Sequence, residues 1–327
     1  MSLDRVINIS DREVASYMTP EDFVNSCDEA FRLYEKGEMV NPPREESLLK
    51  EDGMDVFQLV LRAQWPGKYR GQKVIEERSD IKSGRLGHRM AKIELEDLST
   101  GHRIFFDAEH ITNMRTGAAG VLGAKYLCPC PVSTVAILGT GRIATALALC
   151  ADVVLKPEVI QVTSRKQVNR EAFAEEVADR LMCKLIMTKS LETCVSGADA
   201  VLASVPTPKP VLDKDMLAKN VHISVLGGDG RTQQLEQALF LSRTVVPDHP
   251  TQVLNSGEFL SAQREGHEIL WSKNKAGVTQ HIGHAAQGLL ENLRGRGAIA
   301  YFSGMAIQDV HAASVVWQRY QSRKGLF

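Results

Sequence analysis

Apolar and polar positions divide the first third of the chain into one helix and several strands. Thr19-Pro20-Glu21-Asp22 is a helix-start signal, and the apolar residues that follow it recur on one helical face. Residues 56–63, 73–77 and 89–95 have an extended pattern, and the last of these alternates apolar with charged residues. After a Ser-Thr-Gly turn the chain returns at residues 104–106, so the pattern predicts a β-hairpin within an α+β region.

From residue 134 onward, short apolar strands alternate with helical stretches. Helices are predicted at residues 112–126, 143–155 and 306–320. An alternation of strand and helix is typical of a parallel sheet covered by helices. We expect the final helix to pack against the N-terminal region, because the strands and helices of the alternating region are already accounted for without it. The predicted strands are residues 135–138, 159–163, 183–187, 200–204, 221–226 and 244–246.

A glycine turn stands between the first of these strands and its helix. The sequence Gly139-Thr140-Gly141-Arg142-Ile143-Ala144 has the G-x-G-x-x-A pattern of a dinucleotide-binding turn. The glycines let the backbone approach a pyrophosphate, and the helix N-terminus directs its N–H groups at the phosphates. The pattern is common by chance, but its place between strand and helix supports a Rossmann-type site. We expect residues 139–143 (Gly139, Thr140, Gly141, Arg142 and Ile143) to contact the cofactor.

The end of the second strand indicates which cofactor binds. An NAD site usually has an Asp or Glu there for the ribose 2′-hydroxyl, whereas an Arg accommodates a 2′-phosphate. This chain has Ser164, Arg165 and Lys166 and no acid, which favours NADP(H) over NAD(H). Two alternatives stay open: these cations form a solvated helix start, or Arg165 stacks on adenine and NAD(H) is accepted. Ser204 and Gly304 are further expected cofactor contacts.

Composition and charge exclude several classes of function. The 327 residues carry 39 Lys and Arg against 40 Asp and Glu, a net charge of −1, and 43% of them are apolar. Such a chain has no general attraction to nucleic acid or to a membrane surface. No apolar run approaches the ~18 residues of a spanning helix, and the polar N-terminus does not look like a signal peptide. The six cysteines lack metal-ligand spacing, so we expect reduced thiols, no metal site and a cytoplasmic protein.

Three further segments form a set with the glycine turn. Residues 111–119 read ITNMRTGAA, Gly227-Gly228-Asp229 follows the fifth strand, and residues 302–309 read FSGMAIQD. This set resembles the ornithine cyclodeaminase and mu-crystallin family, whose patterns are I-T-x-x-R-T-x-A-A and F-x-S-x-G-x-A-x-x-D. The last match is one residue shorter between Phe and Gly. The resemblance extends over most of the chain, and four motifs in order are more specific than one.

The resemblance implies a fold and an assembly. The fold class is α/β, with a Rossmann-type dinucleotide-binding domain at residues 113–309. This domain is inserted between the parts of an α+β substrate-binding and dimerisation domain, residues 1–112 plus 310–327. The family's N-terminal domains pair through their sheets, so we expect a homodimer, with a small imino or amino acid as the other partner.

The resemblance also assigns roles to single residues. The family's carboxylate-binding cations fall on Arg44, Lys73 and Arg115, and a guanidinium binds a carboxylate bidentately. Asp229 is the candidate for proton transfer, because it follows a strand and two glycines at the carboxyl edge of the sheet. Lys73 is the second expected catalytic residue. The alternatives are ordinary surface charge for Arg44 and Lys73, and a cap of a helix beyond Gly230 for Asp229.

The segment after Lys73 departs from the family pattern. Residues 76–80 (EERSD) stand where F-P-x-N is common, and no acid precedes the lysine to bind a distal amine. Three cations in this region, Arg78, His88 and Arg89, suit a second substrate carboxylate. The alternative is that they pair with neighbouring acids in a surface network.

Three functions follow, of which the first is the main prediction. The first is an NAD(P)H-dependent imine (ketimine) reductase or amino-acid dehydrogenase acting on a small α-imino acid, such as the dicarboxylic iminosuccinate. The second is an ornithine- or lysine-type cyclodeaminase, which uses bound NAD⁺ without net consumption. The third is a non-catalytic, NADPH-dependent small-molecule binder. The sequence leaves the substrate side chain and the physiological direction open.

Overall fold

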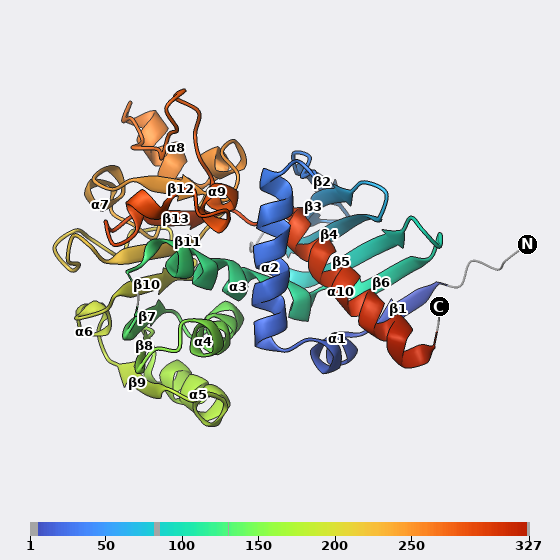
Figure 1. The fold of residues 1–327 in the computed structure, drawn as a ribbon, viewed down its shortest axis with the longest axis horizontal. Coiled ribbons are helices and arrows are strands. Elements are labelled where there is room, and N and C mark those ends of the chain that lie inside the picture. The colour runs from blue at the N-terminus through green and yellow to red at the C-terminus, as the bar shows by residue number, and fades with distance from the viewer. Residues whose placement is uncertain (1–5, 82–85, 130, 326–327) are drawn as a thin grey trace, which may run out of the picture. The chain divides into compact units, whose positions relative to one another are not determined.

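The computed structural model describes residues 6–81, 86–129 and 131–325, without the side chains of residues 86–89. The chain divides into two compact units (Figure 1). Unit 1 comprises residues 1–19, 29–112 and 305–327, and unit 2 comprises residues 20–28 and 113–304. Two boundaries differ from the predicted ones. Residues 305–309 belong to unit 1 because helix α10 begins at Ala306, and the first half of helix α2 (Pro20–Glu35) belongs to unit 2.

Unit 1 is built on a six-stranded sheet in the order β1-β6-β5-β4-β3-β2. Only the β1–β6 pair is parallel among the described strand pairs of this sheet. Helix α10 lies across β3, β4 and β5 (Figure 1), which confirms the prediction for the last helix. The elements are β1 (Ile7–Ile9), α1 (Asp11–Tyr17), β2 (Glu45–Glu51), β3 (Met54–Trp65), β4 (Tyr69–Asp80), β5 (Leu86–Asp97), β6 (Arg103–Asp107) and α10 (Ala306–Lys324).

Sequence reasoning found the hairpin of this sheet and missed both of its edge strands, the three-residue β1 and the longer β2. The predicted return strand is β6, whose Phe106 pairs with Ile93 of β5. Strand β2 is exposed along its whole length, and its two apolar residues, Leu48 and Leu49, are adjacent rather than alternating. A strand that buries neither face has no period of two in its sequence, so the pattern could not reveal it.

Unit 2 is built on a seven-stranded, all-parallel sheet in the order β12-β13-β11-β10-β7-β8-β9. This sheet confirms the predicted α/β class. Its strands are β7 (Thr134–Leu138), β8 (Val159–Thr163), β9 (Lys184–Thr188), β10 (Ala200–Ala203), β11 (His222–Leu226), β12 (Val245–Pro247) and β13 (Ile299–Phe302). Helices α3 (Glu109–Leu127), α4 (Arg142–Val154), α5 (Gln167–Val177), α6 (Leu191–Val195), α7 (Gln237–Leu241), α8 (Gly257–Arg264) and α9 (Ile282–Ala286) complete the helical elements.

Strand β13 was not among the predicted strands, although its four residues are all buried. Its apolar run directly before the Phe302-Ser303-Gly304 motif is a signal that could have revealed it. The strand matters for the site because it places that motif at the carboxyl edge of the sheet, beside β11 and β12.

Three glycines let helix α3 pack unusually close to its neighbours. A Cβ at Gly117 would lie 2.6 Å from the Ala146 carbonyl carbon in α4, and one at Gly123 would lie 2.5 Å from Ser224 Oγ in β11. Gly120 lies between them, and a Cβ there would lie 2.8 Å from Leu147 Cδ2 and 3.0 Å from Leu226 Cδ2. The spacing of three residues keeps all three glycines on one helical face, so this face approaches both α4 and the sheet.

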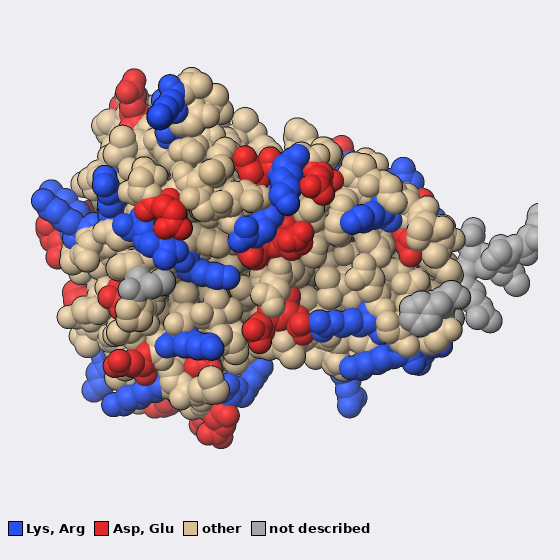
Figure 2. Space-filling view, in the orientation of Figure 1, with Lys and Arg blue, Asp and Glu red and all other residues tan. Residues whose placement is uncertain are grey.

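The surface carries charges of both signs. Figure 2 shows Lys and Arg interspersed with Asp and Glu over the face in view, in keeping with the net charge of −1. None of the described helices is long and apolar enough to span a membrane.

Candidate functional site

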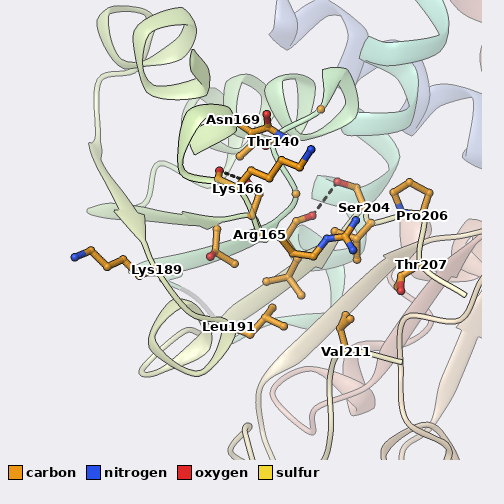
Figure 3. A pocket seen from close by; sticks show the side chains of 16 residues that line it. Thr140, Arg165, Lys166, Asn169, Lys189, Leu191, Ser204, Pro206, Thr207 and Val211 are labelled. Carbon is orange, nitrogen blue, oxygen red and sulfur yellow. Dashed lines mark hydrogen bonds between the residues drawn. The ribbon is translucent and has the colours of Figure 1, made fainter. Parts of the chain in front are cut away.

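A cavity of about 620 Å³ opens at the carboxyl ends of the central strands of unit 2. Its walls come from the segments that follow β7, β8, β9 and β10 (Figure 3). This is the edge at which open α/β sheets bind ligands. The lining residues include Gly139, Thr140, Gly141, Ser164, Arg165, Lys166, Asn169, Lys189, Leu191, Ser204, Val205, Pro206, Thr207 and Val211.

The glycine turn after β7 forms one wall and is shaped for a phosphate. Gly139 has a φ of 110°, and a Cβ there would lie 3.2 Å from the Ser204 carbonyl oxygen. Gly141 is the N-cap of α4 and gives it no side-chain hydrogen bond, while a Cβ at Gly141 would meet open space. The N-terminal N–H groups of α4 therefore stand uncapped by their own N-cap residue, which suits an anionic ligand. Arg142 and Ile143 form the first turn of α4.

The cations after β8 and β9 point in different directions (Figure 3). Arg165 crosses the cavity toward Ser204, Lys166 extends toward Thr140, and Lys189 points away from both. The backbone there is held by Arg170, whose Nη1 donates to the Ser164 carbonyl oxygen at 2.5 Å. No acid is among the described residues that line the cavity. The carboxylate that binds a ribose 2′-hydroxyl in many NAD sites is thus replaced by basic side chains.

A buried amide that sequence reasoning missed holds the segment after β10. Gln234 is 2% exposed, and its Oε1 accepts a hydrogen bond from Val205 N at 2.9 Å. Its Nε2 donates to the Leu226 carbonyl oxygen, also at 2.9 Å. One side chain therefore joins the carboxyl ends of β10 and β11. Ser204 is held from the other side, because its Oγ donates to the Leu138 carbonyl oxygen at 3.1 Å.

Asp229 emerges at the same edge, after β11. The two glycines before it are required by close packing: a Cβ at Gly227 would lie 2.2 Å from Tyr301 Oη, and Gly228 has a φ of 116°. Asp229 Oδ1 accepts from Arg231 N at 2.8 Å, and the Arg231 guanidinium lies 2.7 Å from Oδ2. Helix α7 begins only at Gln237, so the alternative of a helix cap for Asp229 is wrong. The carboxylate is 42% exposed, which leaves it within reach of a ligand.

A buried carboxylate organises the motif after β13. Asp248 is fully buried and accepts hydrogen bonds from Ser303 Oγ and Gly304 N, both at 2.8 Å. Burial raises the pKa of Asp248 above its usual value. Gly304 has a φ of 85°, and a Cβ there would lie 3.1 Å from Arg115 Nη1. Gly304 therefore lies beside the Arg115 guanidinium within unit 2. Sequence reasoning missed Asp248, which the sequence marks only as an acid directly after an apolar strand.

In unit 1 the two expected cations have acidic partners. Lys73 is 1% exposed, and its Nζ lies 2.9 and 2.8 Å from the two carboxylate oxygens of Asp309, which is itself 0% exposed. Arg44 directly precedes β2, has a side chain that is 12% exposed, and places its Nε 2.8 Å from Glu46 Oε1. Lys73 is thus a buried charged group and not the surface charge of the alternative.

Among the cations assigned to a second carboxylate, Arg78 has a side chain that the structure describes, and it contacts acidic side chains. Arg78 is 42% exposed, with Nε 2.8 Å from Glu76 and Nη2 3.7 Å from Glu51. For Arg78 alone, the contact with Glu76 matches the surface pairing that the sequence left as an alternative. The expected partners His88 and Arg89 have side chains outside the described residues.

The comparisons with known proteins agree over almost the whole chain. A sequence model described as the ornithine cyclodeaminase/mu-crystallin family matches residues 6–324. An alanine dehydrogenase from Archaeoglobus fulgidus is 26% identical over 322 residues, which cover 96% of this chain and 95% of that protein.

Solved structures show the same fold. An archaeal alanine dehydrogenase dimer with bound NAD has a TM-score of 0.82 at 25% identity, covering 98% of this chain and 97% of that one. The Δ1-pyrroline-2-carboxylate reductase of Thermococcus litoralis, in complex with NADH and L-proline, has a TM-score of 0.83 at 20% identity, covering 97% and 98%. This chain belongs to the ornithine cyclodeaminase/mu-crystallin family.

Proposed function

We propose that this chain is an NAD(P)H-dependent oxidoreductase that reduces a small α-imino acid to the amino acid. The observation that carries the proposal lies in one sheet: the dinucleotide cavity follows β7, β8 and β10, and Asp229 follows the neighbouring strand β11. A bound nicotinamide supplies a hydride there. The reduction of a C=N bond also needs a proton at nitrogen, and a carboxyl group at this edge is suited to deliver or orient that proton.

The substrate carboxylate needs fixed cations. Arg115 is 7% exposed and lies beside Gly304 in unit 2. In unit 1, the resemblance to the family assigns carboxylate binding to Lys73 and Arg44. Charge-assisted bonds from such groups to a carboxylate are short and strong, and they orient the imine carbon. Because Arg78 already has two acidic partners, the choice of a dicarboxylic substrate has no support from that residue.

We infer that NADP(H) is the preferred cofactor. Arg165 and Lys166 both line the cavity at the position of the usual ribose-binding acid, and their charge fits a 2′-phosphate. Arg165 lies across the cavity in Figure 3. The same position also allows its guanidinium to stack on adenine, in which case NAD(H) binds equally well.

A substrate screen tests the function. Oxidation of NADPH and of NADH is followed with pyruvate, glyoxylate and oxaloacetate, each with ammonia or methylamine, and with Δ1-pyrroline-2-carboxylate. We expect turnover with an imine, and much slower turnover in the Asp229→Asn variant. Release of ammonia from ornithine without net change in cofactor would establish a cyclodeaminase instead. Binding of NADPH and a carboxylate without any turnover would establish a non-catalytic binder.

We also propose a homodimer, as described for the archaeal alanine dehydrogenase. Strand β2 supports it, because Leu48 and Leu49 are 63% and 48% exposed at the edge of the unit 1 sheet. Exposed apolar side chains on a sheet edge are suited to pairing with a second copy. Light scattering coupled to gel filtration gives the mass directly, and a monomer at assay concentrations would contradict the proposal.

A further inference from the structure

The Lys73–Asp309 pair is unusual because both charges are completely buried. Lys73 lies in the interior of β4, in register with Leu61 of β3 and Ile93 of β5. Asp309 lies in the first turn of α10, where the positive end of the helix dipole favours an anion. A buried ammonium costs several kcal/mol unless an opposite charge and hydrogen bonds compensate for its lost hydration. Asp309 provides both to Lys73.

The same helical turn also reaches the segment that carries Arg44. Asn41 is 8% exposed, and its Oδ1 accepts a hydrogen bond from Ile307 N at 3.3 Å. Only two prolines separate Asn41 from Arg44, and proline restricts the backbone. The first turn of α10 is therefore tied to the strand that carries Lys73 and to the segment that carries Arg44.

Close packing fixes this turn against β4. A Cβ at Gly71 would lie 2.8 Å from Val310 Cγ2 and 2.8 Å from the Glu94 carbonyl oxygen. A larger residue at Gly71 would require the Glu94 backbone and the Val310 side chain to move. Gly71 and Lys73 are two residues apart on one face of β4, so the helix turn that excludes a side chain at Gly71 also places Asp309 at Lys73.

We propose that Asp309 is a positioning residue, which holds the Lys73 ammonium in place to bind the substrate carboxylate. The proposal rests on the proposed function, in which Lys73 binds that carboxylate. Both carboxylate oxygens of Asp309 hold the Lys73 Nζ inside unit 1, and the same turn of α10 contacts the Arg44 segment through Asn41. The competing explanation is that the pair only docks α10 on the sheet.

Three variants separate these explanations. Asp309→Asn removes the counter-charge at nearly constant volume, and Asp309→Glu keeps a carboxylate in case the first variant fails to fold. The matched control is Asp97→Asn. Asp97 is also a buried acid beneath α10, where it accepts from Trp317 Nε1 at 2.9 Å, but it lies toward the other end of the helix. All three are measured for melting temperature, for NADPH affinity and for binding of a carboxylate.

Two carboxylate probes make the test independent of the proposed reaction. The first probe is the imine substrate found in the screen, whose KM is measured. The second is pyrrole-2-carboxylate, a stable planar analogue of an imino acid, whose dissociation constant is measured by titration. We expect Asp309→Asn to weaken both by about 10- to 100-fold, the range for losing one charged hydrogen bond. NADPH affinity stays unchanged, Asp309→Glu recovers part of the loss, and Asp97→Asn lowers the melting temperature without changing either carboxylate measurement.

The outcomes that overturn the proposal are specific. Folded Asp309→Asn, or folded Asp309→Glu if the first is insoluble, with wild-type carboxylate affinity would show that the pair only docks the helix. Tighter binding in Asp309→Asn would show that the aspartate competes for the lysine. Wild-type protein that binds no carboxylate also overturns it. If no imine is turned over but pyrrole-2-carboxylate still binds, the proposed reaction is refuted. The role of Asp309 can then still be measured from the affinity for pyrrole-2-carboxylate.

Discussion

Buried His222 predicts a loss of stability in mild acid. It is 0% exposed at the start of β11, and its Nε2 lies 2.9 Å from Ser224 Oγ. That hydroxyl donates its own hydrogen to the Gly120 carbonyl oxygen at 2.7 Å, so the imidazole is the donor to Ser224. Burial lowers the pKa of His222 from 6.5 to about 3, aided by the nearby Arg243 guanidinium and opposed by a hydrogen bond to the Ala298 backbone.

The sign follows from proton uptake. Well above pH 6.5 the imidazole is neutral in both the folded and the unfolded state and contributes nothing to the pH dependence. Below pH 6.5 the unfolded chain takes up a proton that the native chain cannot accept, so stability falls until the native pKa near 3 is reached. From pH 7 to pH 5 this amounts to about 2 kcal/mol, and complete titration amounts to about 5 kcal/mol.

Urea unfolding at pH 7 and pH 5 measures this loss. His222→Gln is the comparison, because its amide keeps a donor for Ser224 and does not titrate. We expect wild type to lose about 2 kcal/mol more than the variant between the two pH values. His281 and His311, whose pKa values burial also lowers, to about 3 and about 4, contribute equally to both proteins. Equal losses in the two proteins would refute the reasoning.

Three further predictions concern the cofactor, the chemistry and the packing. Arg165→Ala should weaken NADPH by about 1.5–3 kcal/mol and NADH much less, because one charged phosphate contact is lost; fluorescence titration with each cofactor checks this, and equal losses would favour adenine stacking. Asp229→Asn should leave NADPH affinity nearly intact and lower turnover by roughly two orders of magnitude or more. If a folded variant has steady-state rates near those of wild type, Asp229 only stabilises the turn that it forms with Arg231. Gly123→Ala should destabilise the protein by about 1–3 kcal/mol, because its Cβ would lie 2.5 Å from Ser224 Oγ; an unchanged urea midpoint would show that α3 shifts freely.

The sequence by itself determined the elements whose signal is local. The apolar strand, glycine turn and helix at residues 134–154 are fully specified by neighbouring residues, because backbone freedom and helix packing act over a few positions. The same holds for the basic end of β8 and for Asp229 after two glycines. Strand β2 was not predicted because it buries neither face. Strand β13 was not predicted either, although its apolar run is visible in the sequence.

Tertiary structure decided which charges meet. Lys73 and Asp309 are 236 residues apart, yet their side chains form one buried pair, and Asp248 reaches Ser303 and Gly304 across 55 and 56 residues. Arg78 instead finds Glu76 on its own strand, two residues away. Local sequence shows that a residue is charged, but only the packing of distant elements sets its partner and burial. The partner and the burial of a charged side chain decide whether it binds a ligand, holds a helix or forms a surface ion pair.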